Sequence, residues 1–265
     1  TMLEAAIKYK TIVDEFDDAI KAGEFKMYLQ PQISAKTRRL TGAEALVRRI
    51  KPDGTIISPI DFIPVYEKSG LISRLDRYIW EQAAAKLGEW KKAGINMSIS
   101  VNISPKDFYY IDIFNTFAGL IKKYDIEPSN LKIEITETTI MSDVPNLMGE
   151  LEELRKAGFT LEMDDFGSGY SSLNTLKDIN VDVLKVDMGF IKETKNVKKS
   201  RIILASVIKM AKELNLLIIT EGVETEEQVD NLTKLGCDVF QGYYFSKAID
   251  VNEFEKRYLY RKKAG

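Results

Sequence analysis

The chain has 265 residues, 45% of them hydrophobic, a formal net charge of -2 and no histidine. Its near-neutral charge gives no general attraction for polymeric nucleic acid or anionic lipid, and the absence of histidine excludes Ser-His-Asp and Cys-His catalysis and argues against a zinc site. Its one cysteine, Cys237, excludes an internal disulfide and is typical of a reducing compartment, so we expect a cytoplasmic protein or domain.

Residues 1–23 are expected to form a helical lead-in to a domain core at about 24–251. No linker-like stretch divides the chain, so we expect one domain over residues 1–265, the size of a single α/β barrel. We find no signal peptide and no apolar run long enough to span a bilayer, so we expect no membrane contact from these residues. A residue precedes the first methionine, which suggests a fragment of a longer protein.

Short apolar runs alternate with amphipathic helical patterns along the rest of the chain. The runs predict strands at 25–34, 40–48, 97–103, 131–137, 159–165, 183–187, 216–221 and 239–245. The patterns between them predict helices at about 74–92, 106–123, 143–157, 198–214 and 224–235. Strands and helices in this alternation predict a (β/α)8 barrel of the TIM type.

The connection between the first two predicted strands is the short polar stretch AKTRR, residues 35–39. A parallel crossover needs a dozen or more residues, so these two strands should be antiparallel. The prediction is therefore a barrel with one antiparallel strand near its start.

Polar residues end seven successive predicted strands, where barrels of this type place their active sites. They are Glu44, Asn102, Glu134, Asp164 with Asp165, Lys185 with Asp187, Glu221 and Gln241. Each one alone would usually be a solvated rim residue. Together, so many carboxylates around one mouth would repel one another unless cations lay between them. The pattern predicts a site for two divalent cations with oxygen ligands, which suits Mg²⁺, Mn²⁺ or Ca²⁺.

Strand geometry assigns directions to some of these residues. Residues two apart face the same side, so Lys185 and Asp187 should point the same way, whereas Glu134 and Glu137 are three apart and should diverge. Only one of the two glutamates can then point into the site, and we select Glu134.

The stretch LEMDDFGSGYSSL at 161–173 contains two adjacent aspartates, whose side chains would diverge in a regular strand. Both can reach shared cations only if the backbone turns sharply, which Gly167 and Gly169 permit. A solvated turn is the alternative for this motif taken alone. The DFG of a protein kinase is excluded, because a kinase also needs a His-Arg-Asp loop and the chain has no histidine.

Nine stretches of the chain, in this order, carry a resemblance to a known family. They are YLQPQI, GAEALVR, FIPVYEKSGLI, VNIS, KIEITET, MDDFGSGYSSL, LKVD, TEGVET and LGCDVFQGYYFS. From about Glu24 to Val251, the sequence resembles the EAL-domain cyclic di-GMP phosphodiesterases. The fold of that family is a barrel with an antiparallel pair at its start, in agreement with the short first connection.

The resemblance implies a role for each matching residue. It implies metal ligation, to two Mg²⁺ or Mn²⁺ ions with Asp164 shared between them, by Glu44, Asn102, Glu134, Asp164 and Asp165. It implies that the general base is Glu221 and that the attacking water is held with the help of Lys185. It implies positions near the dinucleotide for Gln30, Arg48 and Gln241, and a supporting site position for Glu224. It implies that the loop after the paired aspartates is held by Glu137 and Asp187.

Three positions depart from what the family commonly has. Arg49 stands where tryptophan is common, Thr220 where alanine is common, and Ser168 where threonine is common. None of them removes a ligand or the base. The departures bear on fine substrate contacts rather than on the chemistry.

The function implied by the resemblance is metal-dependent hydrolysis of cyclic di-GMP to linear pGpG, by two-metal activation of water. The alternative is a catalytically silent receptor for cyclic di-GMP. A purely structural barrel is a third possibility, but it would not need polar groups at the ends of seven strands.

The resemblance also implies a homodimer, with the loop from Phe166 to Leu173 packed against a partner barrel. Tyr170 and Leu173 are the expected anchors, and the alternative is that they only cap the following helix. A longer protein of this family would carry an attached sensory or diguanylate cyclase domain.

Overall fold

The computed structural model describes residues 2–167, 172–189 and 197–260. Within these ranges a closed barrel is formed by β1 (Phe25–Ser34), β2 (Leu40–Ile50), β4 (Ile99–Ile103), β5 (Leu131–Thr136), β6 (Leu161–Asp164), β7 (Val183–Asp187), β8 (Leu217–Glu221) and β9 (Val239–Phe240). Neighbouring strands pair in chain order, and β9 pairs back with β1. β1 is antiparallel to both of its neighbours, while the other strands run parallel. The predicted barrel with one antiparallel strand is confirmed.

Two short strands extend this barrel at the first hairpin. β3 (Ile56–Ile57) pairs with the end of β2, and β10 (Ile249–Asp250) pairs with β1. The turn between β1 and β2 lies at the end of the barrel opposite the C-terminal ends of the parallel strands, because β1 runs the other way.

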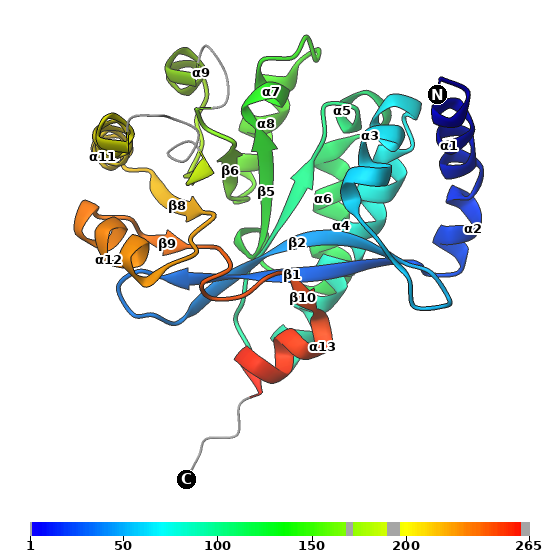
Figure 1. Cartoon of the computed structure of the whole chain (residues 1–265), viewed down its shortest axis with the longest axis horizontal. Coiled ribbons are helices and arrows are strands. Elements are labelled where there is room, and N and C mark those ends of the chain that lie inside the picture. Colours follow the sequence, from blue (N-terminus) through cyan, green and yellow to red (C-terminus); the bar gives the residue numbers. More distant parts are fainter. Residues whose placement is uncertain (1, 168–171, 190–196, 261–265) are drawn as a thin grey trace.

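The helices of the described ranges lie outside the strands or flank the first hairpin (Figure 1). They are α1 (Met2–Asp14), α2 (Phe16–Lys21), α3 (Pro59–Ser69), α4 (Ile72–Lys92), α5 (Asp107–Tyr110), α6 (Ile113–Tyr124), α7 (Glu137–Ile140), α8 (Leu147–Lys156), α9 (Ser172–Asp178), α11 (Val197–Glu213), α12 (Glu226–Leu235) and α13 (Val251–Phe254). A 3₁₀ turn spans Pro128–Asn130, and a π-helical turn spans Glu255–Leu259. None of these helices is long and apolar enough to cross a membrane.

Two predicted elements differ most from the structure. The helix predicted at 106–123 is two helices, because the Asp112 carboxylate caps a new helix by accepting a hydrogen bond from the Asn115 backbone N–H. The strand predicted at 239–245 ends at Phe240. A Cβ on Gly242 would lie 2.2 Å from the carbonyl oxygen of Val223, so the chain leaves the sheet where only glycine allows this close approach.

Side chains alternate between the barrel axis and the outer helices along each strand. On β5 the outward set is Leu131, Ile133 and Ile135, which belongs to the large apolar core between strands and helices. The inward set includes Glu134, which therefore points toward the barrel axis. Deeper in the barrel, Val183, Ile219 and Val239 form a separate small apolar cluster.

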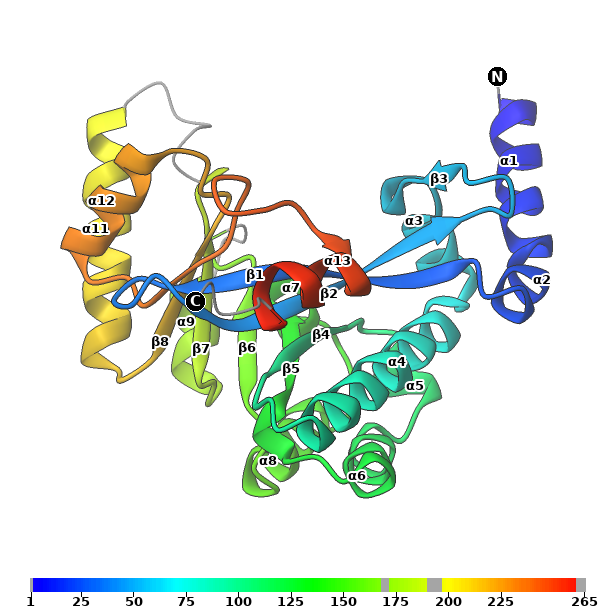
Figure 2. The same cartoon turned by 90° about the horizontal axis from the view of Figure 1, so that it is seen from below.

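The helices α1 and α2 lie at the far end of the long β1–β2 hairpin, well away from α11 and α12 (Figures 1 and 2). Arg49 of β2 is buried there and donates hydrogen bonds to Glu15 at 2.7 Å and to Glu24 at 2.8 Å. Phe16 and Ala19 of α2 belong to the same core as the barrel strands. Arg49, a departure from the family pattern, thus contacts the lead-in helices rather than the barrel mouth.

Candidate active site

Lys185 of β7 lies at the centre of a cluster of carboxylates, and its side chain is 0% exposed. Its Nζ lies 2.5 Å from Oε1 of Glu134, 3.0 Å from Oε1 of Glu221, 3.2 Å from Oε2 of Glu44 and 3.8 Å from Oδ1 of Asp164. The four acids come from β5, β8, β2 and β6. These five side chains therefore converge on one point at the mouth of the barrel, as predicted.

The residues of this cluster differ in the direction of their pKa shifts. Burial disfavours the ammonium of Lys185, but the surrounding carboxylates outweigh it and raise the pKa of Lys185 well above its ordinary value. Burial, followed by like charges, raises the pKa of Glu134 well above the usual range. Burial also raises the pKa of Glu221 well above the usual range, despite the neighbouring lysine. Burial opposes ionisation of Asp164 too, but Lys185 and hydrogen bonds hold its pKa below the ordinary value.

The backbone turns sharply at Asp165 itself, which has a left-handed φ of 55°. Gly167 follows with a φ of 98°, while Gly169 lies outside the described residues. The turn therefore begins one residue after the strand, earlier than the glycines alone indicated. A non-glycine residue in this region costs about 1–2 kcal/mol, a strain typical of functional sites. Burial, followed by the charge of Asp164, raises the pKa of Asp165.

Amide side chains hold the carboxylate of Glu44. Its Oε1 accepts a hydrogen bond from Nδ2 of Asn102 at 3.3 Å, and its Oε2 accepts one from Nε2 of Gln241 at 2.5 Å. Gln30 lies on the same side of the mouth, where its Oε1 accepts from Gln241 and its Nε2 donates to the carbonyl of Ser246. The expected ligand Asn102 and the expected substrate residues Gln30 and Gln241 are thus brought together around one acid.

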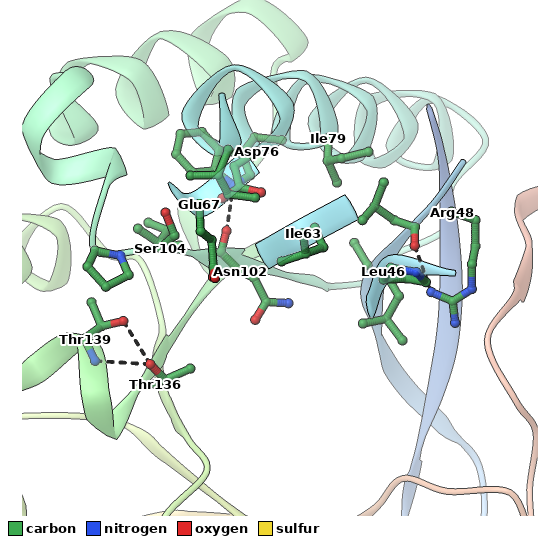
Figure 3. A pocket seen from close by; sticks show the side chains of 17 residues that line it. Leu46, Arg48, Ile63, Glu67, Asp76, Ile79, Asn102, Ser104, Thr136 and Thr139 are labelled. Atoms are coloured by element: carbon green, nitrogen blue, oxygen red, sulfur yellow. Dashed lines mark hydrogen bonds between the residues drawn. The ribbon is translucent and has the colours of Figure 1, made fainter. Parts of the chain in front are cut away.

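A cavity of about 280 Å³ opens beside Arg48 and Asn102 (Figure 3). Its walls are largely apolar, with Ile63 and Ile79 on two different helices, and the acids Glu67 and Asp76 also line it.

The sequence reasoning missed Asp76 and Glu67 as site residues. A signal for Asp76 was present in the sequence, because it interrupts the apolar stripe of Ile72, Leu75 and Ile79, at the start of the predicted helix 74–92. The structure places the Asp76 carboxyl against that of Asp107. Burial, followed by the neighbouring carboxyl, raises the pKa of Asp76 well above the usual range.

A second cavity, of about 310 Å³, lies on the other side of the carboxylates. It is lined by Gln30, Asp187, Glu221, Gly222, Glu224, Gln241, Gly242 and Tyr243. The first cavity reaches Asn102 and the second reaches Glu221, so the two cavities flank the acidic cluster. Together they give the mouth room for an elongated ligand.

The loop after the paired aspartates is contacted by Glu137, whose Oε2 accepts a hydrogen bond from the Gly167 backbone N–H at 3.3 Å. Asp187 instead accepts from the Gly189 backbone N–H at 2.6 Å. The expected anchor Tyr170 and the side chain of Leu173 lie outside the described residues. Packing of this loop on a partner barrel stays a prediction.

The residues present fit divalent metal ions in their chemistry. All expected donors are oxygens, and four carboxylates face a single ammonium. The buried atoms Glu134 Oε2 and Asp164 Oδ1 accept no hydrogen bond from the described residues. Among the described residues, no three acidic side chains are arranged around an open point that could hold a metal ion. The ammonium of Lys185 lies among the carboxylates instead. The donor set therefore suits the ions once Lys185 and the carboxylates rearrange around them.

Comparison with known proteins places this site in a family. The family model described as EAL domain matches residues 13–248. The chain is 36% identical over 239 residues to the signaling protein YkoW of Bacillus subtilis. The alignment covers 90% of this chain and 30% of YkoW. It is 32% identical over 243 residues to the bifunctional diguanylate cyclase/cyclic di-GMP phosphodiesterase MucR of Pseudomonas aeruginosa, which covers 91% of this chain and 36% of MucR.

The fold is also similar to that of a solved structure. The PaMucR phosphodiesterase in complex with c-di-GMP superposes with a TM-score of 0.85 at 32% identity, over 92% of this chain and 99% of that one. The chain spans about a third of the length of the two curated relatives. The matched residues include the whole barrel and every residue of the acidic cluster. The chain belongs to the EAL domain family.

Proposed function

We propose that this chain hydrolyses cyclic di-GMP to linear pGpG. One observation carries the proposal, namely the convergence of Lys185 and four carboxylates at the mouth of an EAL barrel, between two cavities. Relatives named as cyclic di-GMP phosphodiesterases at comparable identity support it. Since these relatives are much longer than this chain, the activity is proposed for this domain as part of a larger protein.

Two divalent ions, Mg²⁺ or Mn²⁺, are proposed as cofactors, held by Glu44, Asn102, Glu134, Asp164 and Asp165. When bound, they would neutralise the phosphodiester and make a water molecule a stronger nucleophile. The orphaned oxygens of Glu134 and Asp164 are the observation that supports this assignment. Lys185 now neutralises part of the same negative charge, and it would help to hold the attacking water.

Glu221 is proposed as the general base that accepts the proton from the attacking water. Its raised pKa brings a carboxylate closer to the range in which a general base is efficient at neutral pH. Its position also suits the role, because it both lines the second cavity and lies 3.0 Å from Lys185.

The two cavities would take the two halves of the dinucleotide. The first has apolar walls that can cover a purine ring, and the carboxyls of Asp76 and Glu67 can accept hydrogen bonds from the N1–H and amino group of guanine. Arg48 lines the same cavity and can bind a phosphate oxygen. Gln30, Glu224 and Gln241 line the second cavity and would contact the other half.

We also propose a homodimer in which the loop after Asp165 packs on a partner barrel and positions that aspartate. The contact of Glu137 with Gly167 supports this, because it links the loop to the end of β5. Sedimentation and activity followed together across a dilution series test it. Full specific activity in a monomeric population would contradict the coupling.

The function is tested by incubating the purified chain with cyclic di-GMP in Mn²⁺, Mg²⁺, Ca²⁺ or a chelator, while binding is measured in parallel. We expect pGpG with Mn²⁺ or Mg²⁺, little with Ca²⁺ because of its looser geometry, and none with the chelator. Binding without hydrolysis in every metal would identify a receptor instead. Absence of both would reject the substrate.

A further inference from the structure

Gln32 of β1 lies below the carboxylate cluster and belongs to none of the roles assigned above. Its Nε2 donates a hydrogen bond to Oε1 of Gln241 at 3.2 Å. Nε2 of Gln241 in turn donates to Oε2 of Glu44 at 2.5 Å and to Oε1 of Gln30 at 3.2 Å. The residues Gln32 and Gln241 are 1% and 3% exposed, so bulk water has little access to these bonds.

The direction of these bonds is determined by chemistry. A carboxylate can only accept, so the group of Gln241 that faces Glu44 must be its NH₂. The carbonyl of Gln241 then faces the other way and needs a donor, which Gln32 supplies. If the Gln241 amide were flipped, its oxygen would face the oxygens of Glu44 and Gln30, and its NH₂ would face the NH₂ of Gln32. Glu44 and Gln30 therefore select this orientation, and Gln32 supplies the donor that the Gln241 carbonyl then requires.

The neighbouring strand leaves room for this glutamine. Gln32 pairs with Gly42 of β2, and a Cβ on Gly42 would lie 3.0 Å from Oε1 of Gln32 and 2.7 Å from Oγ of Ser98. A larger residue at position 42 would push the Gln32 side chain away from Gln241.

We propose that Gln32 is a positioning residue, which fixes the amide of Gln241 and through it the carboxylate of Glu44. This inference rests on the proposed function, because it takes Glu44 as a metal ligand. Partners behind metal ligands typically contribute about 10–100-fold to metal affinity by orienting the ligand. Without Gln32 the carbonyl of Gln241 loses its donor, and the Gln241 amide is held only at its NH₂, by Glu44 and Gln30.

The test is direct Mn²⁺ binding to the metal-free protein by calorimetry, with no substrate present. Gln32→Met keeps the length of the side chain but removes the donor, and we expect about 10-fold weaker binding. Gln32→Glu should weaken binding more, because a carboxylate there would attract the NH₂ of Gln241 and turn its oxygen toward Glu44. Gln241→Met should lose a similar factor, and the Gln32→Met/Gln241→Met double variant should lose no more than Gln241→Met alone.

Gln82→Met is the matched control, because Gln82 is a partly buried glutamine that bonds the backbone of β1 at Met27 and Phe25 and does not touch the site. It should lower the melting temperature but leave Mn²⁺ affinity unchanged. Wild-type affinity in Gln32→Met or Gln32→Glu, multiplicative losses in the double variant, or no Mn²⁺ binding by the wild type would each overturn the proposal. If the wild type binds Mn²⁺ but does not hydrolyse cyclic di-GMP, the proposed function fails while this positioning role stands.

Discussion

The Nζ of Lys185 lies 3.0 Å from Oε1 of Glu221, within the ring of carboxylates at the barrel mouth. The proposed base and the only cation in contact with it are therefore direct neighbours in the described part of the chain. In the absence of metal ions, the lysine is what makes it possible to bury Glu44, Glu134 and Glu221 together, because isolated buried charges are strongly unfavourable. The same contact has consequences for stability and for proton transfer.

Lys185→Met should destabilise the metal-free protein by about 3–5 kcal/mol, because removal of one partner leaves buried carboxylates without a cation. Mn²⁺ should restore more stability to the variant than to the wild type, since the ions would replace the missing charge. Urea unfolding with and without Mn²⁺ measures both effects. Lys123→Met, at an exposed ion pair with Glu81, is the control and should unfold like the wild type. Equal unfolding of Lys185→Met and wild type would contradict the central role of this cation.

Glu221→Gln should reduce turnover by about 10²–10⁴-fold while substrate binding and the fold are retained, because the amide fills the same space but cannot accept the proton. Single-turnover kinetics and a binding titration separate the two effects. Glu226→Gln, on the exposed first turn of α12, changes the same charge away from the site and should keep wild-type turnover. Near-normal turnover in Glu221→Gln would assign the base elsewhere.

Asp76 makes the free energy of unfolding depend on pH. Its folded pKa is raised above its ordinary value of 3.8, as is that of Asp107, so the folded state holds a proton that the unfolded state releases. The stability contribution is then fully present below about pH 3.8 and is lost as the pH rises through the folded pKa.

Asp76→Asn removes one of the two facing carboxyls and should be more stable than the wild type at pH 8, with the difference shrinking toward pH 4.5. Cyclic di-GMP binding should weaken about 10-fold, because Asn replaces one carboxyl oxygen that can accept a guanine N–H with an NH₂ donor. Urea midpoints at pH 4.5, 6 and 8, with a binding titration at pH 8, measure both. A difference in midpoint that does not change with pH would show that the two carboxyls do not share a proton.

Arg49→Met should lower the free energy of unfolding by about 3 kcal/mol, because it removes the buried guanidinium that pairs with Glu15 and Glu24. Amide hydrogen exchange should speed up in α1 and α2, while turnover at low temperature stays near wild type. Arg74→Met removes an exposed pair with Asp17 and should change neither. If exchange in α1 and α2 is unchanged, Arg49 does not hold these helices.

The barrel was predictable because its local signals agree. Apolar runs alternate with helical patterns, and the five-residue AKTRR connection is too short for anything but an antiparallel pair. The helix α3 was missed because Pro64 lies inside it and obscures its pattern. The end of β9 was missed because it depends on the close approach of Gly242 to Val223. These two residues touch in space but are separated along the sequence, so local patterns do not show the contact.

The site was predictable where its residues lie on strands, and less so elsewhere. Glu44, Glu134, Asp164, Lys185 and Glu221 all follow from strand position and meet at one point. Asp76 lies near the start of α4, and only the packing of that helix over the mouth brings it to the cavity. Gln32 was hidden for another reason, because its effect depends on the amide orientation of Gln241, a residue more than 200 positions away.

The reversal of β1 decides from which side the chain enters the barrel. In an all-parallel barrel the first strand begins at the face opposite the active site, whereas β1 begins beside Arg49 and runs down past Gln30 to Ser34. The segment before β1 therefore lies at the face of the barrel that carries the acidic cluster, where α1 packs on α3 and Lys8 pairs with Asp61 at 2.8 Å. A displacement of α1 would reach the cavity beside Arg48 through α3, whose Ile63 and Glu67 line it, without passing through the body of the barrel.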